Sequence, residues 1–186
     1  MKTVEYRRKR EGKTDYRNRV RLLQNNKPRV IIRVSLKNIM VQIAEYKEEG
    51  DNILASADSK EIEKKFGWKA GRSNIPAAYL TGYLLGKKAV KAGVKEAILD
   101  IGLEKSVKKG KIYSALKGIL DGGLKVPCSE KVFPSEDSIK GIHIANYAKK
   151  LSQEGKYEKV FSDYVKKGVK AEDIPNYFEE TKKKID

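Results

Sequence analysis

The sequence has little of what disulfide, zinc or histidine chemistry requires. Its 186 residues include one cysteine, Cys128, and one histidine, His143. A single cysteine cannot form an internal disulfide, which is typical of a protein from a reducing compartment. No second cysteine and no histidine at zinc spacing accompany Cys128, so we expect no metal site and no cofactor.

Long apolar runs are also missing. No stretch approaches the roughly 18 to 20 consecutive apolar residues that span a bilayer, and no apolar run follows the basic N-terminus as in a secretory signal. We therefore expect a soluble cytoplasmic protein. Hydrophobic residues make up 39% of the chain, which is enough for one core with an extension or small subdomain.

Acidic residues are outnumbered: 41 Lys and Arg face 25 Asp and Glu, which gives a net charge of +16. Such an excess repels itself until a partner neutralises it, and phosphate is the commonest partner. An anionic membrane surface is the alternative, but it requires a basic helix with a large apolar face. The basic N-terminal segment has too few apolar residues for that.

Half of this excess lies at the N-terminus. Residues 1–29 carry net +8, residues 30–148 net +6 and residues 149–186 net +2. We interpret residues 1–27 as a basic RNA-binding arm with a short helix, capped by Thr14 or Asp15, and we expect residues 1–20 to become ordered only on RNA. A solubilising tail or a localisation signal is the alternative.

The centre of the chain, residues 28–134, predicts an α/β domain. Strands rich in β-branched residues are expected at Arg29–Ser35, Ile39–Tyr46 and Ile53–Ser59, with a polar loop at residues 48–52. A fourth strand at Ala97–Ile101 is nearly all apolar, which favours a central place in the sheet.

Helices are expected at Glu61–Phe66, from Asn74 to about Ala92, and at Ile112–Asp121. On the longest of them Ala78, Gly82 and Gly86 recur every four residues, and this small face would let the helix approach the sheet closely.

Residues 135–186 predict a helical C-terminal appendix. One of its helices is expected at Tyr157–Lys167, and the last begins at Asp173 and Pro175. The predicted fold is an α/β fold: a three-stranded antiparallel meander, a fourth parallel strand and flanking helices, as in ribonuclease H.

The residues do not support an enzyme. Nucleases of that topology bind two metals with converging carboxylates, one of them on the first strand, but here the first strand carries Arg29 and Arg33, and Asp100 stands alone on the fourth. The segment Gly82–Lys88 is one residue short of a phosphate-binding loop and lacks its Ser or Thr. Another RNA-binding or RNA-processing protein with a ribonuclease-H-like core remains the alternative.

Motifs along nearly the whole chain point to one family. They are Tyr6–Tyr16, Pro28–Val30, Ser35–Ile39 with Gln42, Leu54–Ala57, Asn74–Gly82, Ala115–Leu124 with Pro127, Phe133–Pro134, and His143 within Ile142–Tyr147. The chain thereby resembles the universal large-subunit ribosomal protein family that binds 5S ribosomal RNA, numbered eighteen in bacteria and archaea and five in eukaryotes. The N-terminal motif and the segment Asp121–Leu124 resemble the archaeal and eukaryotic branch, and the short appendix resembles the archaeal proteins.

The resemblance implies a structural protein of the 50S ribosomal subunit in the cytoplasm. Its partners would be 5S rRNA, 23S rRNA in the central protuberance and neighbouring large-subunit proteins, with no membrane and no small-molecule substrate. Two positions depart from the family's pattern: Leu36 stands in a turn where a polar residue is expected, and Cys128 stands where histidine is frequent.

The resemblance also implies which residues bind RNA. The arm would lie along 5S rRNA and contact it through phosphates and base stacking. The first hairpin would contact sugars and phosphates, and a basic loop before a helix N-terminus would bind phosphate. A lysine-rich loop would add an electrostatic contact. The residues, in that order, are Arg7, Arg8, Lys9, Arg10, Lys13, Tyr16, Arg17, Arg19 and Arg21; Arg33, Ser35, Lys37, Asn38 and Gln42; Lys69, Arg72, Ser73 and Asn74; and Lys105, Lys108 and Lys109.

Overall fold

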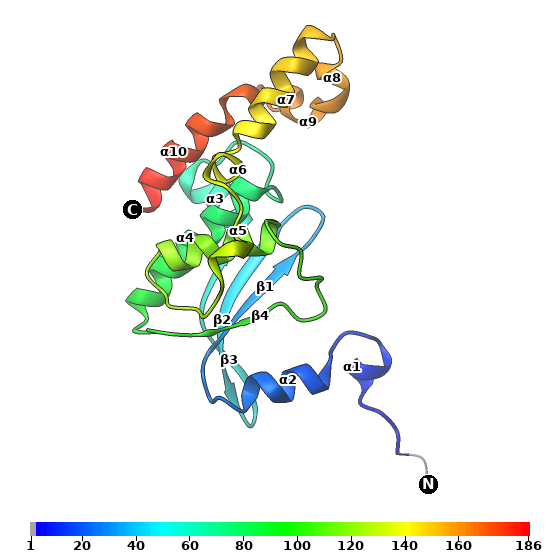
Figure 1. The fold of residues 1–186 in the computed structure, drawn as a ribbon, viewed down its shortest axis with the longest axis vertical. Helices are drawn as coiled ribbons and strands as arrows, with labels where there is room; N and C mark the ends of the chain where they lie inside the picture. Colours follow the sequence, from blue (N-terminus) through cyan, green and yellow to red (C-terminus); the bar gives the residue numbers. More distant parts are fainter. Residues whose placement is uncertain (1–2) are drawn as a thin grey trace.

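The computed structural model describes residues 3–186, so Met1 and Lys2 of the arm lie outside the described residues. Its centre is a four-stranded sheet of order β3-β2-β1-β4 (Figure 1). The strands are β1 (Arg29–Val34), β2 (Ile39–Lys47), β3 (Gly50–Asp58) and β4 (Ile98–Asp100). β1 to β3 form an antiparallel meander, and β4 is parallel to β1. The predicted α/β fold class is confirmed.

The second hairpin is tighter than the sequence predicts. β3 begins at Gly50 rather than Ile53, because Asp51 and Asn52 continue the ladder opposite Tyr46 and Glu45. A register shift at Ile43/Ala44 bends the two strands as they extend beyond the rest of the sheet. The polar residues at positions 48–52 therefore belong mostly to an exposed ribbon, not to a loop.

The prediction that the fourth strand is central is wrong. β4 pairs only with β1, over three positions, and forms one edge of the sheet. Its apolar residues are explained by packing instead: Ala97 is buried, and Leu99 and Ile101 pack against the hydrophobic core. A run of apolar residues indicates that other elements cover both faces of a strand. Both faces of an edge strand can be covered in the same way.

Three helices follow the meander at the expected places: α3 (Ser59–Phe66), α4 (Ile75–Lys91) and α5 (Lys111–Asp121). α4 and α5 lie together on one side of the sheet (Figure 1). The Asn74 side chain caps α4 by accepting a hydrogen bond from the Ala77 N–H at 2.9 Å, and Pro76 occupies its first turn. The helix ends before Gly93, which adopts a positive φ of 78°.

The small face of α4 packs on α5, not on the sheet. A Cβ added to Gly82 would lie 1.9 Å from the Ala115 carbonyl oxygen of α5, and one added to Gly118 of α5 would lie 2.1 Å from the Tyr79 carbonyl oxygen. The expectation that this face approaches the sheet is therefore wrong. Glycines on both helices let two backbones touch, which periodicity along one helix could not reveal.

The C-terminal appendix is helical, as predicted, and continues the hydrophobic core of the sheet domain. Its elements are α6 (Glu136–Lys140), α7 (Ile142–Gln153), α8 (Tyr157–Val160), α9 (Ser162–Lys166), a short 3-10 turn at Ala171–Asp173, and α10 (Ile174–Ile185); another 3-10 turn, Glu130–Val132, precedes the appendix. Leu151, Phe161, Ile174 and Phe178 belong to the same buried cluster as the sheet residues. The last helix follows Asp173 as expected.

One predicted helix of the appendix is two. The segment Tyr157–Lys167 breaks at Phe161, which lies between α8 and α9 outside helical geometry. The Phe161 ring is buried against Tyr157 and Tyr164, with ring centroids 5.2 and 5.5 Å apart. The break thereby places an aromatic side chain in the hydrophobic core.

The arm lies at the opposite end of the molecule from the appendix (Figure 1). It contains α1 (Arg7–Arg10) and α2 (Tyr16–Leu23), neither of which has a buried residue. Asp15 caps α2 by accepting hydrogen bonds from the N–H groups of Arg17 and Asn18. Ordering of the arm by RNA stays a prediction. Between residues 3 and 186, no helix combines the length and apolarity needed to cross a membrane.

Candidate nucleic-acid interface

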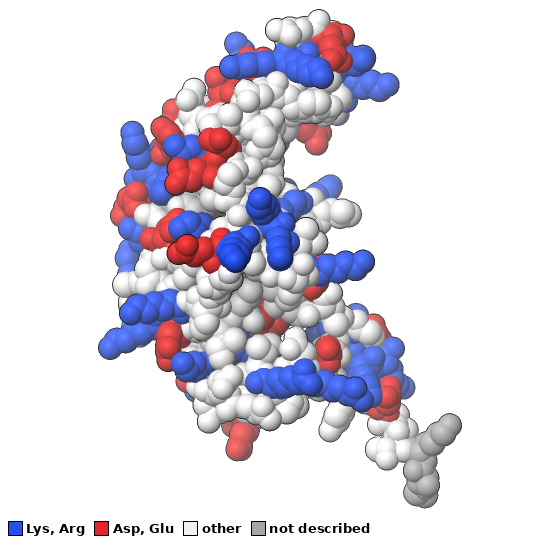
Figure 2. Space-filling model, in the orientation of Figure 1, with Lys and Arg blue, Asp and Glu red and all other residues white. Residues whose placement is uncertain are grey.

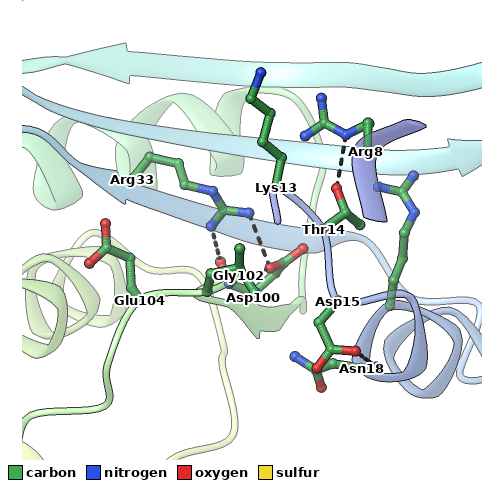
Figure 3. A pocket seen from close by; sticks show the side chains of 11 residues that line it. Arg8, Lys13, Thr14, Asp15, Asn18, Arg33, Asp100, Gly102 and Glu104 are labelled. Atoms are coloured by element: carbon green, nitrogen blue, oxygen red, sulfur yellow. Dashed lines mark hydrogen bonds and ion pairs between the residues drawn. The ribbon is translucent and has the colours of Figure 1, made fainter. Parts of the chain in front are cut away.

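Two basic hollows bring together many of the predicted RNA-binding residues. The first is a cavity of about 410 Å³ between the arm and the sheet (Figure 3). It is lined by four of the predicted residues together with acidic and polar neighbours: Arg8, Lys13, Arg19 and Arg33, with Thr14, Asp15, Asn18, Asp100, Gly102, Leu103 and Glu104. The arm supplies one wall, and β1 with the segment after β4 supplies the other.

A chain of alternating charges joins the two walls. Arg19 of α2 contacts Asp51 of the β2–β3 ribbon at 3.1 Å, and Asp51 lies 2.7 Å from the buried Arg29. Arg29 in turn pairs with Asp100 at 2.8 Å, and Asp100 pairs with Arg33 at 3.3 Å. One of these pairs, Arg19–Asp51, joins the arm to the sheet, and the others connect β1, β3 and β4 within it.

Asp100, predicted to be the lone acid of the fourth strand, is held by arginines in this relay. Asp100 also accepts a hydrogen bond from the Gly102 N–H at 2.8 Å, and the Arg33 guanidinium donates to the Asp100 carbonyl at 2.9 Å. Partial burial raises the pKa of Asp51, but Arg29 and Arg19 beside it outweigh that effect and hold the pKa below its ordinary value. The sequence signal was present: a cation inside a strand, Arg29, needs an acidic partner.

We expect Asp100→Asn to destabilise the sheet domain by about 1 to 3 kcal/mol, because the substitution removes one counter-charge of the buried Arg29 while keeping the side chain's volume. Chemical denaturation monitored by circular dichroism measures the change. Glu104→Gln, at an exposed position of the same cavity where residues 3–186 provide no ion-pair partner, is the matched control and should leave the unfolding free energy nearly unchanged. Equal stability of the two variants would show that the relay does not support the fold.

The second hollow is a groove of about 610 Å³, which we name the appendix groove. Five predicted residues line it, from the β1–β2 turn and the loop before α4: Lys37, Lys69, Arg72, Ser73 and Asn74. The facing wall comes from the appendix, with Ile144 of α7 and Asp163, Tyr164, Lys166 and Lys167 in or next to α9. In Figure 2 the outline is hollowed between the appendix and the body, with Lys and Arg around the hollow.

Hydrogen bonds fix the body wall of the appendix groove. Ser35 closes the β1–β2 turn by accepting from the Asn38 N–H at 2.9 Å, and the Ser73 hydroxyl donates to the Ser35 carbonyl at 2.9 Å. Lys111 donates to Ser73 from the start of α5. The turn and the basic loop are thereby joined, although 38 residues separate them.

Ion pairs and one tyrosine fix the appendix wall. Glu63 of α3 pairs with Arg72 at 2.8 Å and with Lys167 at 3.2 Å, while the Tyr164 hydroxyl accepts a hydrogen bond from the Gly71 N–H at 2.9 Å. Burial raises the pKa of Glu63, but its hydrogen bond from Lys167 and the charge of Arg72 hold the pKa below its ordinary value.

The other predicted residues line neither hollow. Most arm cations point to solvent along α1 and α2, Gln42 lies on the sheet opposite Ile31, and the lysine-rich loop is a separate exposed segment. These residues are Arg7, Lys9, Arg10, Tyr16, Arg17, Arg21, Ser35, Asn38, Gln42, Lys105, Lys108 and Lys109. The residues that sequence reasoning missed are Leu36, Tyr164, Lys166 and Lys167, because only the fold places the appendix opposite the turn.

Comparison with known proteins identifies the family. The model of the family described as "Ribosomal large subunit proteins 60S L5, and 50S L18" matches residues 2–95 and 91–129. The chain is 51% identical over 182 residues to the large ribosomal subunit protein uL18 of Korarchaeum cryptofilum, covering 98% of this chain and 93% of that protein. It is 48% identical over 184 residues to the uL18 of Sulfurisphaera tokodaii, with the same coverage. The chain belongs to this family.

As a member of the uL18 family the chain is a structural constituent of the large subunit of the cytoplasmic ribosome, and it is not an enzyme. The two archaeal relatives confirm the resemblance to the archaeal branch. Among residues 3–186 no three His, Cys, Asp or Glu side chains gather as metal ligands, and Cys128 is exposed.

Proposed function

We propose that this chain binds 5S rRNA through its basic arm and helps attach it to 23S rRNA in the central protuberance. The observation that carries the proposal is the arm itself: residues 1–27 hold net +7 of the total +16, and neither α1 nor α2 buries a residue. An exposed helix pair dense in arginine is suited to phosphate and to unstacked bases rather than to a protein core.

The arm's present ion pairs are easily exchanged for phosphate. Lys9 pairs with Glu5, Arg7 with Glu11 at 3.6 Å, and all four side chains are substantially exposed. Exposed pairs of this kind contribute roughly 0 to 1 kcal/mol each, whereas charge-assisted hydrogen bonds to phosphate are stronger. The Tyr6 and Tyr16 rings, with centroids 5.1 Å apart, offer faces for base stacking beside these cations.

The remaining predicted contacts extend the proposal to the body. Residues 28–134 would form the 5S rRNA-binding domain, with the first hairpin and the loop before α4 as its RNA-facing elements, and residues 135–186 a separate appendix. Neighbouring large-subunit proteins would cover part of the remaining surface. The lysine-rich loop, with Lys105, Lys108 and Lys109, would add a further phosphate contact.

We expect binding to 5S rRNA to depend steeply on salt. If six to ten phosphates are contacted, the affinity should fall by about 10³- to 10⁵-fold between roughly 50 and 200 mM salt, because each neutralised phosphate releases counterions. Filter binding of purified 5S rRNA across this range measures the slope. A non-ribosomal RNA of equal length is the control and should bind more weakly with a similar slope. A flat salt profile for 5S rRNA would contradict the proposal.

A further inference from the structure

The appendix groove has an excess of positive charge that nothing in residues 3–186 neutralises. Five cations line it and only one acid, Asp163. Glu63 lies behind the groove and pairs with Arg72 and Lys167, but Lys37 on one wall and Lys166 on the other make no ion pair. Like charges facing each other across a hollow repel, so this arrangement favours a bound anion between them.

The two walls are held apart in a fixed geometry. Tyr164 is tied to the Gly71 backbone, Lys167 to Glu63, and the break at Phe161 anchors α9 on the hydrophobic core. A groove that exists before its ligand arrives loses little conformational freedom on binding. The groove is open at its mouth, where the Leu36 side chain is 99% exposed.

From these observations we infer that the appendix groove binds a single strand of ribosomal RNA, with Lys37 and Lys166 holding its phosphates from opposite walls. This inference deepens the proposed function by adding the appendix to the RNA-binding surface. It rests on that function in taking the ligand to be ribosomal RNA and in taking the first hairpin and the loop before α4, which form the body wall, to face RNA.

A nucleic-acid strand fits the groove better than an acidic peptide does. Arg72, Ser73 and Asn74 directly precede the N-terminus of α4, a 17-residue helix, so groups that can bind phosphate line the groove. Beside them Leu36, Ile144 and Tyr164 provide apolar and aromatic surface, on which bases of any sequence can pack. Alternating phosphates and flat bases match this mixture of cations and apolar side chains.

The test reverses one charge on each wall. Both lysines are exposed and make no ion pair with any residue between 3 and 186, so Lys37→Glu/Lys166→Glu should fold like the native chain, as checked by its melting temperature. Lys47→Glu/Lys159→Glu is the matched control, because it makes the same charge change at exposed positions outside both hollows. Binding is measured with purified 5S rRNA and, separately, with purified 23S rRNA.

We expect the groove variant to bind one of these RNAs at least tenfold more weakly than the control variant, with a salt slope lower by about 1.4, for two phosphates of a single strand. Which RNA is affected identifies the source of the strand. Equal affinities of the two variants for both RNAs would overturn the inference, and so would loss of binding to a polyglutamate peptide with RNA affinity unchanged.

Cross-linking in assembled large subunits gives an independent readout. Ultraviolet irradiation should attach a nucleotide to the peptide that contains Tyr164, and the attachment should fall in subunits that carry the groove variant. Absence of any adduct on the segment 162–170 would contradict the inference even if the arm binds 5S rRNA. Conversely, an arm without effect on 5S rRNA binding would refute the proposed function and leave this result intact.

Discussion

Replacing Arg7, Arg8, Lys9 and Arg10 by alanine is expected to weaken 5S rRNA binding by about 100-fold or more. Each lost charge-assisted contact contributes roughly 1 kcal/mol or more, and four such losses add to well over a factor of 100. The same variant should lower the salt slope by about three to four, because each cation is expected to neutralise one phosphate. Filter binding across salt concentrations measures both quantities.

A matched control removes the same charge elsewhere. Alanine at Lys47, Lys91, Lys149 and Lys159, all exposed and outside both hollows, should change the slope far less. The arm variant should also leave amide exchange of residues 28–148 unchanged, since α1 buries nothing. An unchanged salt slope in the arm variant would show that these four residues do not bind phosphate.

Amide exchange on the free protein tests how the arm is ordered. Residues 3–20 carry high charge and few apolar side chains, so they cannot offset a backbone ordering cost of about 1 to 2 kcal/mol per residue without RNA. We expect their amides to exchange rapidly, with the slowest of them near Arg19, where the arm contacts Asp51. Strong protection of α1 in the absence of RNA would show that the arm is a structural part of the domain.

Gly82→Leu is expected to lower the free energy of unfolding by about 3 kcal/mol or more. The new Cβ alone would lie 1.9 Å from the Ala115 carbonyl oxygen, and a backbone atom cannot turn aside as a flexible side chain does, so α4 and α5 would have to separate. Overpacking usually costs about 1 to 3 kcal/mol, and this contact places the variant at or above the upper end. The melting temperature should fall by roughly 6 to 12 °C for a chain of this length.

Two further variants make the measurement specific. Gly82→Ala should also destabilise the chain, because the clash begins at the Cβ atom, whereas Lys91→Ala on the exposed end of α4 should not. If Gly82→Ala has the same melting temperature as the native chain, the contact between α4 and α5 is looser than the structure describes. None of these variants should change the salt slope of RNA binding, since Gly82 is buried far from the cationic residues of the arm.

The predictable part of this fold depends on local patterns. The strands, the cap at Asn74 and the glycine after α4 follow from residue types at neighbouring positions, and each was found near its expected place. The predictions of a polar loop at residues 48–52 and of a single helix at Tyr157–Lys167 failed for a common reason. Contacts that residue types along the chain do not display, the pairing of Asp51 and Asn52 with β2 and the packing of the Phe161 ring into the hydrophobic core, overrode local preference.

The candidate site divides in the same way. Charge and residue type marked the arm, the first hairpin and the loop before α4, because phosphate binding depends on side chains that a sequence displays directly. The pairing of Arg29 with Asp100 and the position of Lys166 opposite Lys37 could not be predicted from the sequence, because 71 residues separate the first pair and 129 residues the second.

The sequence by itself determined the class of partner, the family and the order of elements, because net charge, motifs and short-range periodicity are properties of the chain alone. Only the tertiary structure decided that β4 is an edge strand, that Gly82 faces a helix and that the appendix closes a groove. The physical reason is that these features are contacts between distant segments, and a contact of that kind has no energy until the chain has folded.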